Sequence, residues 1–82
     1  MTTVLVIESN RESRQIVQRA ASSEWKILEA PDGLSGLEMA RRHLQQIDLI
    51  VLALDLPDID GLVVCVRLRE ISPIVPILPV AD

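Results

Sequence analysis

Acidic and hydroxyl side chains gather where the apolar runs of this sequence stop. Glu8 and Ser9 directly follow the run at residues 4–7, and Asp55 follows the run at 49–54. Carboxylate oxygens in such places can hold Mg²⁺, and a carboxylate can also accept a phosphoryl group. These three side chains are therefore the first candidates for a chemical role.

Other reactive side chains are few. His43 is the only histidine and Cys65 the only cysteine, so the sequence holds neither an internal disulfide pair nor a Cys/His metal cluster. We expect His43, beside Arg41 and Arg42, on a polar helix face, and Cys65 as a small buried side chain. These interpretations are favoured over a phosphoryl-donor role for His43 and a redox role for Cys65.

The elements that must position these side chains follow from hydrophobic patterning. Continuous β-branched and aliphatic runs predict strands that are covered on both faces, and apolar residues recurring three and four apart predict helices. The segment at 61–71 is rich in valine, which favours a strand, but a parallel sheet needs a crossover there. The expected order is strand, helix, strand, helix, strand, helix, strand, at residues 4–7, 11–22, 25–30, 34–45, 49–54, 61–71 and 75–80.

Local signals mark the ends and faces of these elements. Pro31, Asp32 and Gly33 predict a turn, and Gly36 is also assigned to turn chemistry, since its spacing lacks a phosphate-binding fingerprint. In the loop before the third helix, two aspartates are expected to shape the turn and favour the positive helix end, namely Asp58 and Asp60. The first helix is expected to bury one apolar face, made of Ile16, Val17, Ala20 and Ala21.

This alternation predicts an α/β fold with one parallel sheet and helices on both faces, in a single domain over residues 1–82. The chain has 82 residues, is 49% hydrophobic and contains one Trp, no Phe and no Tyr, so Ile, Val and Leu must build the core. In open α/β sheets, ligands bind beyond the carboxyl ends of the strands. Glu8, Ser9 and Asp55 are therefore expected at the same edge of the sheet.

Charge and hydropathy argue against several classes of partner. The net charge is −4 with a single lysine, whereas a nucleic-acid surface needs clustered basic residues. The first residues do not have the pattern of a signal peptide, and no apolar run reaches the roughly 18 residues of a membrane span. We expect no direct contact with nucleic acid or membrane, and a cytoplasmic location.

The sequence resembles the receiver domains of bacterial two-component response regulators. The resemblance implies a flavodoxin-like βαβαβαβ unit that lacks the last strand and helices of a full receiver, about two thirds of that domain. It covers the whole chain and rests on Val-Leu-Val-Ile-Glu at 4–8, Leu-Glu-Ala-Pro-Asp-Gly at 28–33, Asp-Leu-Ile-Val-Leu at 48–52, Leu-Pro-Asp-Ile-Asp-Gly-Leu at 56–62 and Pro-Ile-Leu at 76–78.

The resemblance also implies a site whose chemistry has been lost. The position of the phosphoryl-accepting aspartate holds Ala53, and the position of the phosphate-binding hydroxyl holds Ala81. Of the acidic pair that holds Mg²⁺ in the family, Glu8 remains and Ser9 replaces the principal ligand. Only Glu8 and Asp55 are left as carboxylates for a metal, so we expect no cofactor and no tightly bound Mg²⁺.

Three hypotheses follow. The favoured one is an atypical, pseudo-receiver module in phosphorelay signal transduction that is not an enzyme, acts by protein–protein interaction and is not phosphorylated at Ala53. The alternative is a phosphoryl-accepting receiver that uses Asp55 with Mg²⁺ and catalyses its own phosphorylation. The third is an excised or engineered piece of a receiver without independent activity.

The interaction hypothesis depends on two sequence features. Val63 and Val66 lie three apart on one helix face and form either a wide core stripe or an apolar contact surface. Pro79 interrupts the fourth strand, so it points its missing N–H outward from an edge strand or marks a bulge. We expect a protein partner, or self-association, through this sheet edge or the third helix.

Overall fold

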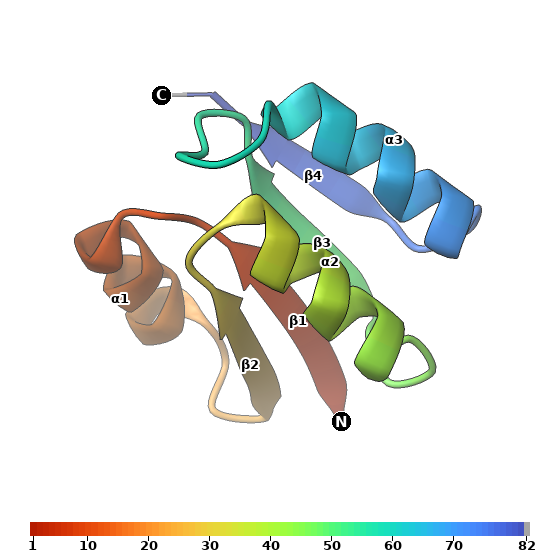
Figure 1. Ribbon diagram of the computed structural model, residues 1–82. Coiled ribbons are helices and arrows are strands. Elements are labelled where there is room, and N and C mark those ends of the chain that lie inside the picture. The colour runs from red at the N-terminus through yellow and green to blue at the C-terminus, as the bar shows by residue number, and fades with distance from the viewer. Residues whose placement is uncertain (82) are drawn as a thin grey trace.

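The computed structural model describes residues 1–81 and shows one four-stranded sheet with three helices (Figure 1). Strands and helices alternate as expected, and the valine-rich third segment is a helix. The elements are β1 (Thr2–Ile7), α1 (Arg11–Ala20), β2 (Trp25–Ala30), α2 (Gly33–Arg42), β3 (Leu49–Ala53), α3 (Gly61–Ile71) and β4 (Ile77–Val80).

All strand pairs are parallel, and the strand order is β2-β1-β3-β4. Ile7, the last residue of β1, pairs with Ala30 on one side and Leu52 on the other, while Ala53 pairs with Val80. All four strands therefore end at the same edge of the sheet (Figure 1). The predicted α/β class and parallel sheet are confirmed.

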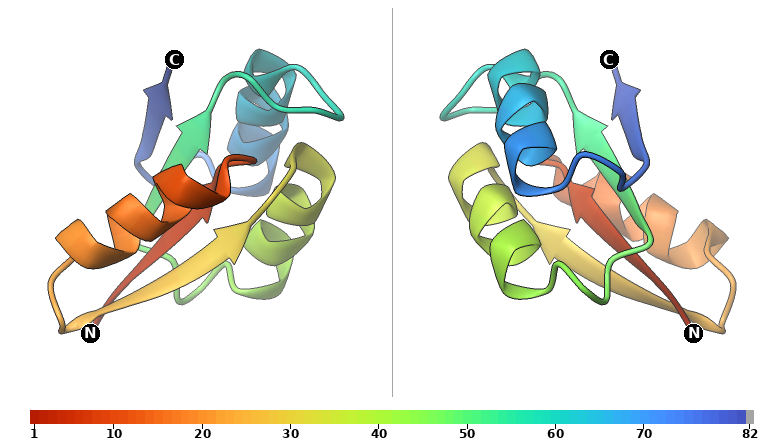
Figure 2. Two further views of the ribbon diagram at one scale, coloured as in Figure 1. Left: turned by 90° about the vertical axis from the view of Figure 1, so that its left-hand side faces the viewer. Right: turned by 90° about the vertical axis from the view of Figure 1, so that its right-hand side faces the viewer.

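Helices cover the two faces of the sheet unequally. α1 lies on one face, and α2 and α3 lie side by side on the other (Figure 2). The main core fills the space under α2 and α3 with aliphatic side chains that are at most 2% exposed: Leu5, Ile7, Leu37, Ile50, Leu52, Val64 and Leu68.

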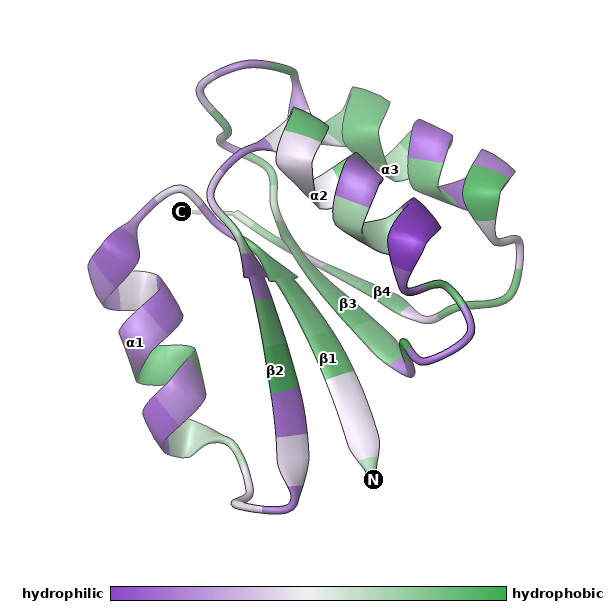
Figure 3. Ribbon diagram, turned by 60° about the horizontal axis from the view of Figure 1, so that its bottom comes forward, coloured by the Kyte–Doolittle hydropathy of each residue, from purple (hydrophilic) through white to green (hydrophobic). Residues whose placement is uncertain are grey.

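Polar contacts hold α1 to the sheet. An Nη1 of Arg14 donates to the carbonyl oxygens of Glu8 and Ser9, at 2.6 and 3.1 Å, and its Nε lies 3.2 Å from a carboxylate oxygen of Glu29. In the described structure α1 has no buried residue, and Ile16 is 63% exposed. The apolar face was predicted to be buried, and this was wrong: Ile16 and Ala20 are exposed, and Val17 and Ala21 are only half-buried. Figure 3 shows α1 as mostly hydrophilic, and within residues 1–81 no second helix packs beside α1 on this face.

Two elements start at other residues than the sequence predicted, one because of a helix cap and one beside a proline. The side chain of Asp32 accepts a hydrogen bond of 2.8 Å from the Ser35 N–H, so α2 begins at Gly33, one residue before the expected start. Pro76 precedes β4, which starts at Ile77, later than expected. Neither change moves a candidate site residue to another element.

Glycine permits two close approaches that turn chemistry does not explain. Gly36 lies inside α2, and a Cβ there would come within 2.6 Å of the Ile7 side chain in β1. Gly61 begins α3, and a Cβ there would lie 2.6 Å from the carbonyl oxygen of Leu54. Gly61 also donates its N–H to that oxygen, at 3.2 Å. The start of α3 is thereby held directly against the end of β3.

We expect Gly61→Ala to destabilise the fold, although alanine is the better helix former. The added methyl group meets backbone atoms of Leu54, which cannot move aside as a side chain could. Overpacking of this kind costs about 1–3 kcal/mol. Urea denaturation measures the change in the free energy of unfolding.

Leu62→Ala is the matched control, because Leu62 is the next residue of α3 and is 63% exposed. Its effect should stay within about 0.5 kcal/mol of the wild type, as for other surface substitutions. Equal urea midpoints for Gly61→Ala and the wild type would contradict the close approach.

Candidate functional site

The parallel sheet brings three of the predicted site residues to one edge. Since Ile7 pairs with Leu52, Glu8 and Ala53 are the next residues on two neighbouring strands. Ala81 follows Val80, which pairs with Ala53. The crossovers from β1 and β3 diverge at this point, which is where open α/β sheets bind ligands. Asp82 lies outside the described residues.

The chemical groups at this edge are sparse. Ala53 is 2% exposed and contributes a buried methyl group. The Glu8 carboxylate accepts a hydrogen bond of 3.1 Å from the Asn10 N–H, just before α1. Ser9 and Ala81 are exposed. The end of β3 therefore offers no side-chain oxygen, and the one carboxylate after β1 has a local backbone partner.

The donor set does not fit a magnesium ion. Mg²⁺ needs a near-octahedral set of oxygen ligands, usually including one or two carboxylates. Within residues 1–81 no group of three or more His, Cys, Asp or Glu side chains could hold a metal. The guanidinium of Arg14 already bonds the carbonyl oxygens of Glu8 and Ser9, which places a fixed positive charge beside the Glu8–Ser9 backbone.

Asp55 lies beyond the end of β3. The strand ends at Ala53, and the carbonyl of Leu54 already accepts the N–H of Gly61 at the start of α3. Asp55 is exposed, and its carboxylate accepts none of the hydrogen bonds found within residues 1–81. The carboxylate is therefore free in solvent on a loop, and the Glu8 carboxylate bonds Asn10 rather than a group near Asp55.

The other two loop aspartates cap two different helices. Asp60 accepts from the Leu62 N–H at 2.8 Å, which confirms its expected role at the start of α3. Asp58 instead reaches α2, where its two oxygens accept from the N–H groups of Gly33 and Leu34, both at 2.8 Å. Asp58 was expected to shape its own turn and to act at α3. It does bond N–H groups of its own turn, but its role at a helix start is at α2, across 25 residues, and not at α3.

The backbone bonds change the acidity of Asp58. Desolvation raises the pKa of this carboxyl, but hydrogen bonds from backbone N–H groups outweigh it and hold the pKa below the ordinary value of 3.8. The donors are those of Leu34, Gly33, Asp58 itself and Ile59. The carboxylate form is thus the one that the fold stabilises.

The two valines of α3 are outside the core. Val63 is 41% and Val66 62% exposed, while Val64 and Leu68 are at most 1% exposed. This rules out the core-stripe interpretation of the two valines. Together with the exposed Leu62 they form what we call the α3 apolar face.

In the sheet formed by residues 1–81, β4 is one of the two edge strands, and β2 is the other. Ile50 donates its N–H to the carbonyl of Pro76 at 2.9 Å, and Leu54 donates to that of Val80 at 3.0 Å. Backbone groups alternate in direction along a strand, so Pro79, between these residues, points its nitrogen to the open edge. Its missing N–H costs no ladder bond with β3.

Comparison with known proteins identifies the relatives of this chain. The family model described as the response regulator receiver domain matches residues 4–81. The probable transcriptional regulatory protein TcrX of Mycobacterium tuberculosis is 40% identical over 77 residues, which cover 93% of this chain. The two-component response regulator-like protein APRR5 of Arabidopsis thaliana is 31% identical over 68 residues, 82% of this chain.

Solved structures agree on the fold. In the crystal structure of the CheX–CheY–BeF3–Mg²⁺ complex from Borrelia burgdorferi, the matching chain superposes with a TM-score of 0.87 at 21% identity, over 98% of this chain and 61% of that one. The present chain spans 32% of TcrX and 12% of APRR5. None of the helices within residues 1–81 is long and apolar enough to cross a membrane.

We expect Asp58 to make stability depend on pH in the acid range. A carboxyl whose pKa is lowered in the folded state stabilises the fold above its unfolded pKa, near 3.8, and this stabilisation is lost as the pH falls through the folded pKa. Asp58→Asn should therefore lower the urea midpoint at pH 6 and show a smaller loss between pH 6 and about pH 3.

Asp55→Asn is the control, because it removes the same charge from the same loop without removing an acceptor of a described hydrogen bond. Its midpoint should follow the wild type at both pH values. If Asp58→Asn and the wild type lost equal stability on acidification, the α2 cap would not be the source of the pH dependence.

Proposed function

Because the chain belongs to the response regulator receiver domain family, we propose that it serves two-component phosphorelay signalling as an atypical receiver that acts through protein contacts and is not phosphorylated at Ala53. Ala53 carries this proposal. Its methyl group is buried at the end of β3, where the family resemblance places the phosphoryl-accepting carboxylate. A methyl group has no lone pair with which to attack a phosphoryl donor.

The neighbouring side chains support the same proposal. Ser9 and Ala81 stand where the resemblance places a metal ligand and a phosphate-binding hydroxyl, and the Glu8 carboxylate bonds the Asn10 N–H. Autophosphorylation would need a divalent cation to offset the charge of the transferred group. In our proposal the domain holds no Mg²⁺ and is not an enzyme.

Two surfaces are available for a partner protein in this proposal. The α3 apolar face exposes Leu62, Val63 and Val66 side by side. The open edge of β4 exposes backbone groups, but Pro79 removes one donor from it. Since a missing donor weakens pairing with a further strand, we favour the α3 apolar face over edge-to-edge self-association.

Phosphorylation is tested directly by incubating the protein with acetyl phosphate and Mg²⁺ and measuring its intact mass. We expect no adduct of about 80 Da on the wild type, while a receiver that keeps the strand-end aspartate gains it under the same conditions. An adduct on the wild type that Asp55→Asn abolishes would establish the alternative, in which the free carboxylate of Asp55 accepts the phosphoryl group.

The contact surface is tested with a photo-crosslinking amino acid at position 66 in living cells. We expect ultraviolet light to give a crosslinked protein adduct from position 66 and none from Arg11, an exposed control position on α1. Val63→Ser should reduce the adduct while changing the free energy of unfolding by less than about 0.5 kcal/mol, because Val63 is 41% exposed. Equal adducts with and without Val63→Ser would refute the assignment of this face.

A further inference from the structure

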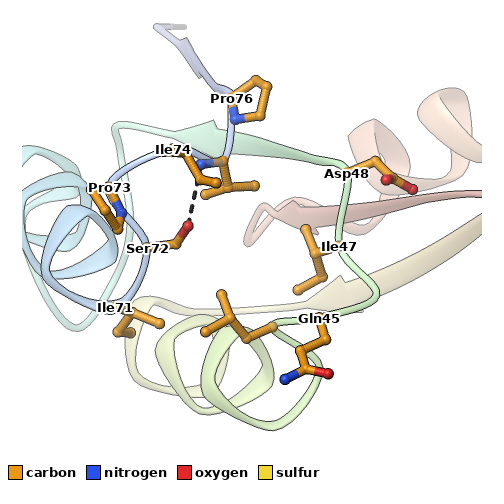
Figure 4. A pocket seen from close by; sticks show the side chains of 10 residues that line it. Gln45, Ile47, Asp48, Ile71, Ser72, Pro73, Ile74 and Pro76 are labelled. Carbon is orange, nitrogen blue, oxygen red and sulfur yellow. Dashed lines mark hydrogen bonds between the residues drawn. The ribbon is translucent and has the colours of Figure 1, made fainter.

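A hollow lies at the amino ends of the strands, opposite the edge that holds Ala53. It has a volume of about 600 Å³ and lies between the loop after α2 and the loop after α3 (Figure 4). We call it the amino-end groove. Its lining is Leu44, Gln45, Ile47, Asp48, Ile71, Ser72, Pro73, Ile74, Val75 and Pro76.

The walls of the amino-end groove are mostly aliphatic. Ile74 is 86% exposed and Leu44 37%, although both are side chains that usually gain by burial. The polar side chain of Asp48 is already engaged, since one of its oxygens accepts the Thr3 N–H at 2.8 Å. Figure 4 shows the Asp48 carboxylate turned away from Ser72 and Ile74.

The loop that carries Ile74 is fixed by hydrogen bonds. The Ser72 hydroxyl accepts the Val75 N–H at 3.2 Å, and an Nη1 of Arg69 donates to the carbonyl of Val75 at 2.5 Å. Pro73 and Pro76 on either side of Ile74 restrict the backbone further. A partner would therefore not have to order this loop on binding, which lowers the entropic cost of association.

A basic hollow adjoins the amino-end groove. It has a volume of about 380 Å³, is lined by residues 41–46, and shares Leu44 and Gln45 with the groove. Arg41, Arg42 and His43 follow one another here, in a chain whose net charge is −4. Within residues 1–81 the ion pair found for this stretch joins Arg42 to Glu38, at 3.2 Å and with both side chains more than 60% exposed.

Adjacent apolar and basic hollows fit a ligand that carries both aliphatic and acidic groups. We propose that the amino-end groove binds an acidic segment of a partner protein, with an aliphatic side chain placed against Ile74 and Leu44 and carboxylates beside Arg41 and Arg42. The apolar contact supplies most of the affinity, and the charges select acidic segments and speed association. This docking surface is separate from the α3 apolar face and does not depend on the state of Ala53.

A second copy of this chain is the less suitable occupant. The acidic and aliphatic segment that it could offer is the loop before α3, at residues 54–62. Two of the three carboxylates in that loop are already bonded, Asp58 to backbone N–H groups of α2 and Asp60 to the Leu62 N–H. Inserting this loop into a groove would compete with its own helix caps.

The test is a titration of the ¹⁵N-labelled chain with the peptide Gly-Glu-Glu-Leu-Leu-Glu-Gly. We expect the amide resonances of residues 44–48 and 71–76 to shift, and the affinity to fall as salt is added. Ile74→Ser and Arg41→Glu should each weaken binding about tenfold or more. Both side chains are exposed, so the variants should keep the urea midpoint of the wild type.

Arg11→Glu is the matched control, because it makes the same charge change at an exposed position on α1. It should leave the affinity within about twofold. The proposal is overturned if the peptide shifts no groove resonance at about 1 mM, if a peptide with Lys for Glu or Ser for Leu binds equally well, or if Arg11→Glu weakens binding as much as Arg41→Glu. Groove resonances that shift with protein concentration alone would assign the groove to a second copy instead.

Discussion

The pairing of β1 with both β2 and β3 is the constraint on which the rest of the structure depends. Val4, Leu5, Val6 and Ile7 are at most 2% exposed, so this strand is covered on both faces as well as on both edges. Its parallel register fixes the carboxyl ends of three strands at one edge and places Glu8 beside Ala53. Because β2 and β3 lie on opposite sides of β1, right-handed crossovers put α1 and α2 on opposite faces, and within residues 1–81 α1 is the one helix on its face.

The acidic residues near this edge stabilise the fold by capping helices. Asp32, Asp58 and Asp60 accept backbone N–H groups at the start of α2 or α3, where the helix dipole also favours a negative charge. Gly61 lets the capped end of α3 meet Leu54 directly. Aspartates therefore remain in the sequence around this site because they cap helices, even though the group at the end of β3 is the methyl of Ala53.

Sequence patterns predicted what depends on local chemistry or on strand topology. They predicted the order of elements, the parallel sheet, the Asp60 cap and the place of Glu8 at the carboxyl edge, and the family resemblance pointed to Ala53 and Ala81 at the same edge. They failed where burial or a hydrogen-bond partner depends on residues far away in the sequence. The periodicity around Ile16 shows an apolar face but not whether anything covers it, and the bond from Asp58 to Gly33 spans 25 residues. The amino-end groove joins two loops far apart in the chain, so no single stretch of sequence could reveal it.

An interaction domain without a phosphoryl switch must display its surfaces permanently. A ligand or a modification shifts a conformational equilibrium only through different affinities for the two states. If nothing is attached at Ala53, that edge offers no such difference, and the partner must recognise the fold as it stands. Local contacts would serve such a role in our proposal, since Asp60 caps the helix that carries the α3 apolar face, and Arg69 and Ser72 fix the loop that carries Ile74. Binding would then be controlled by the amount and location of the two proteins rather than by a change of shape in this domain.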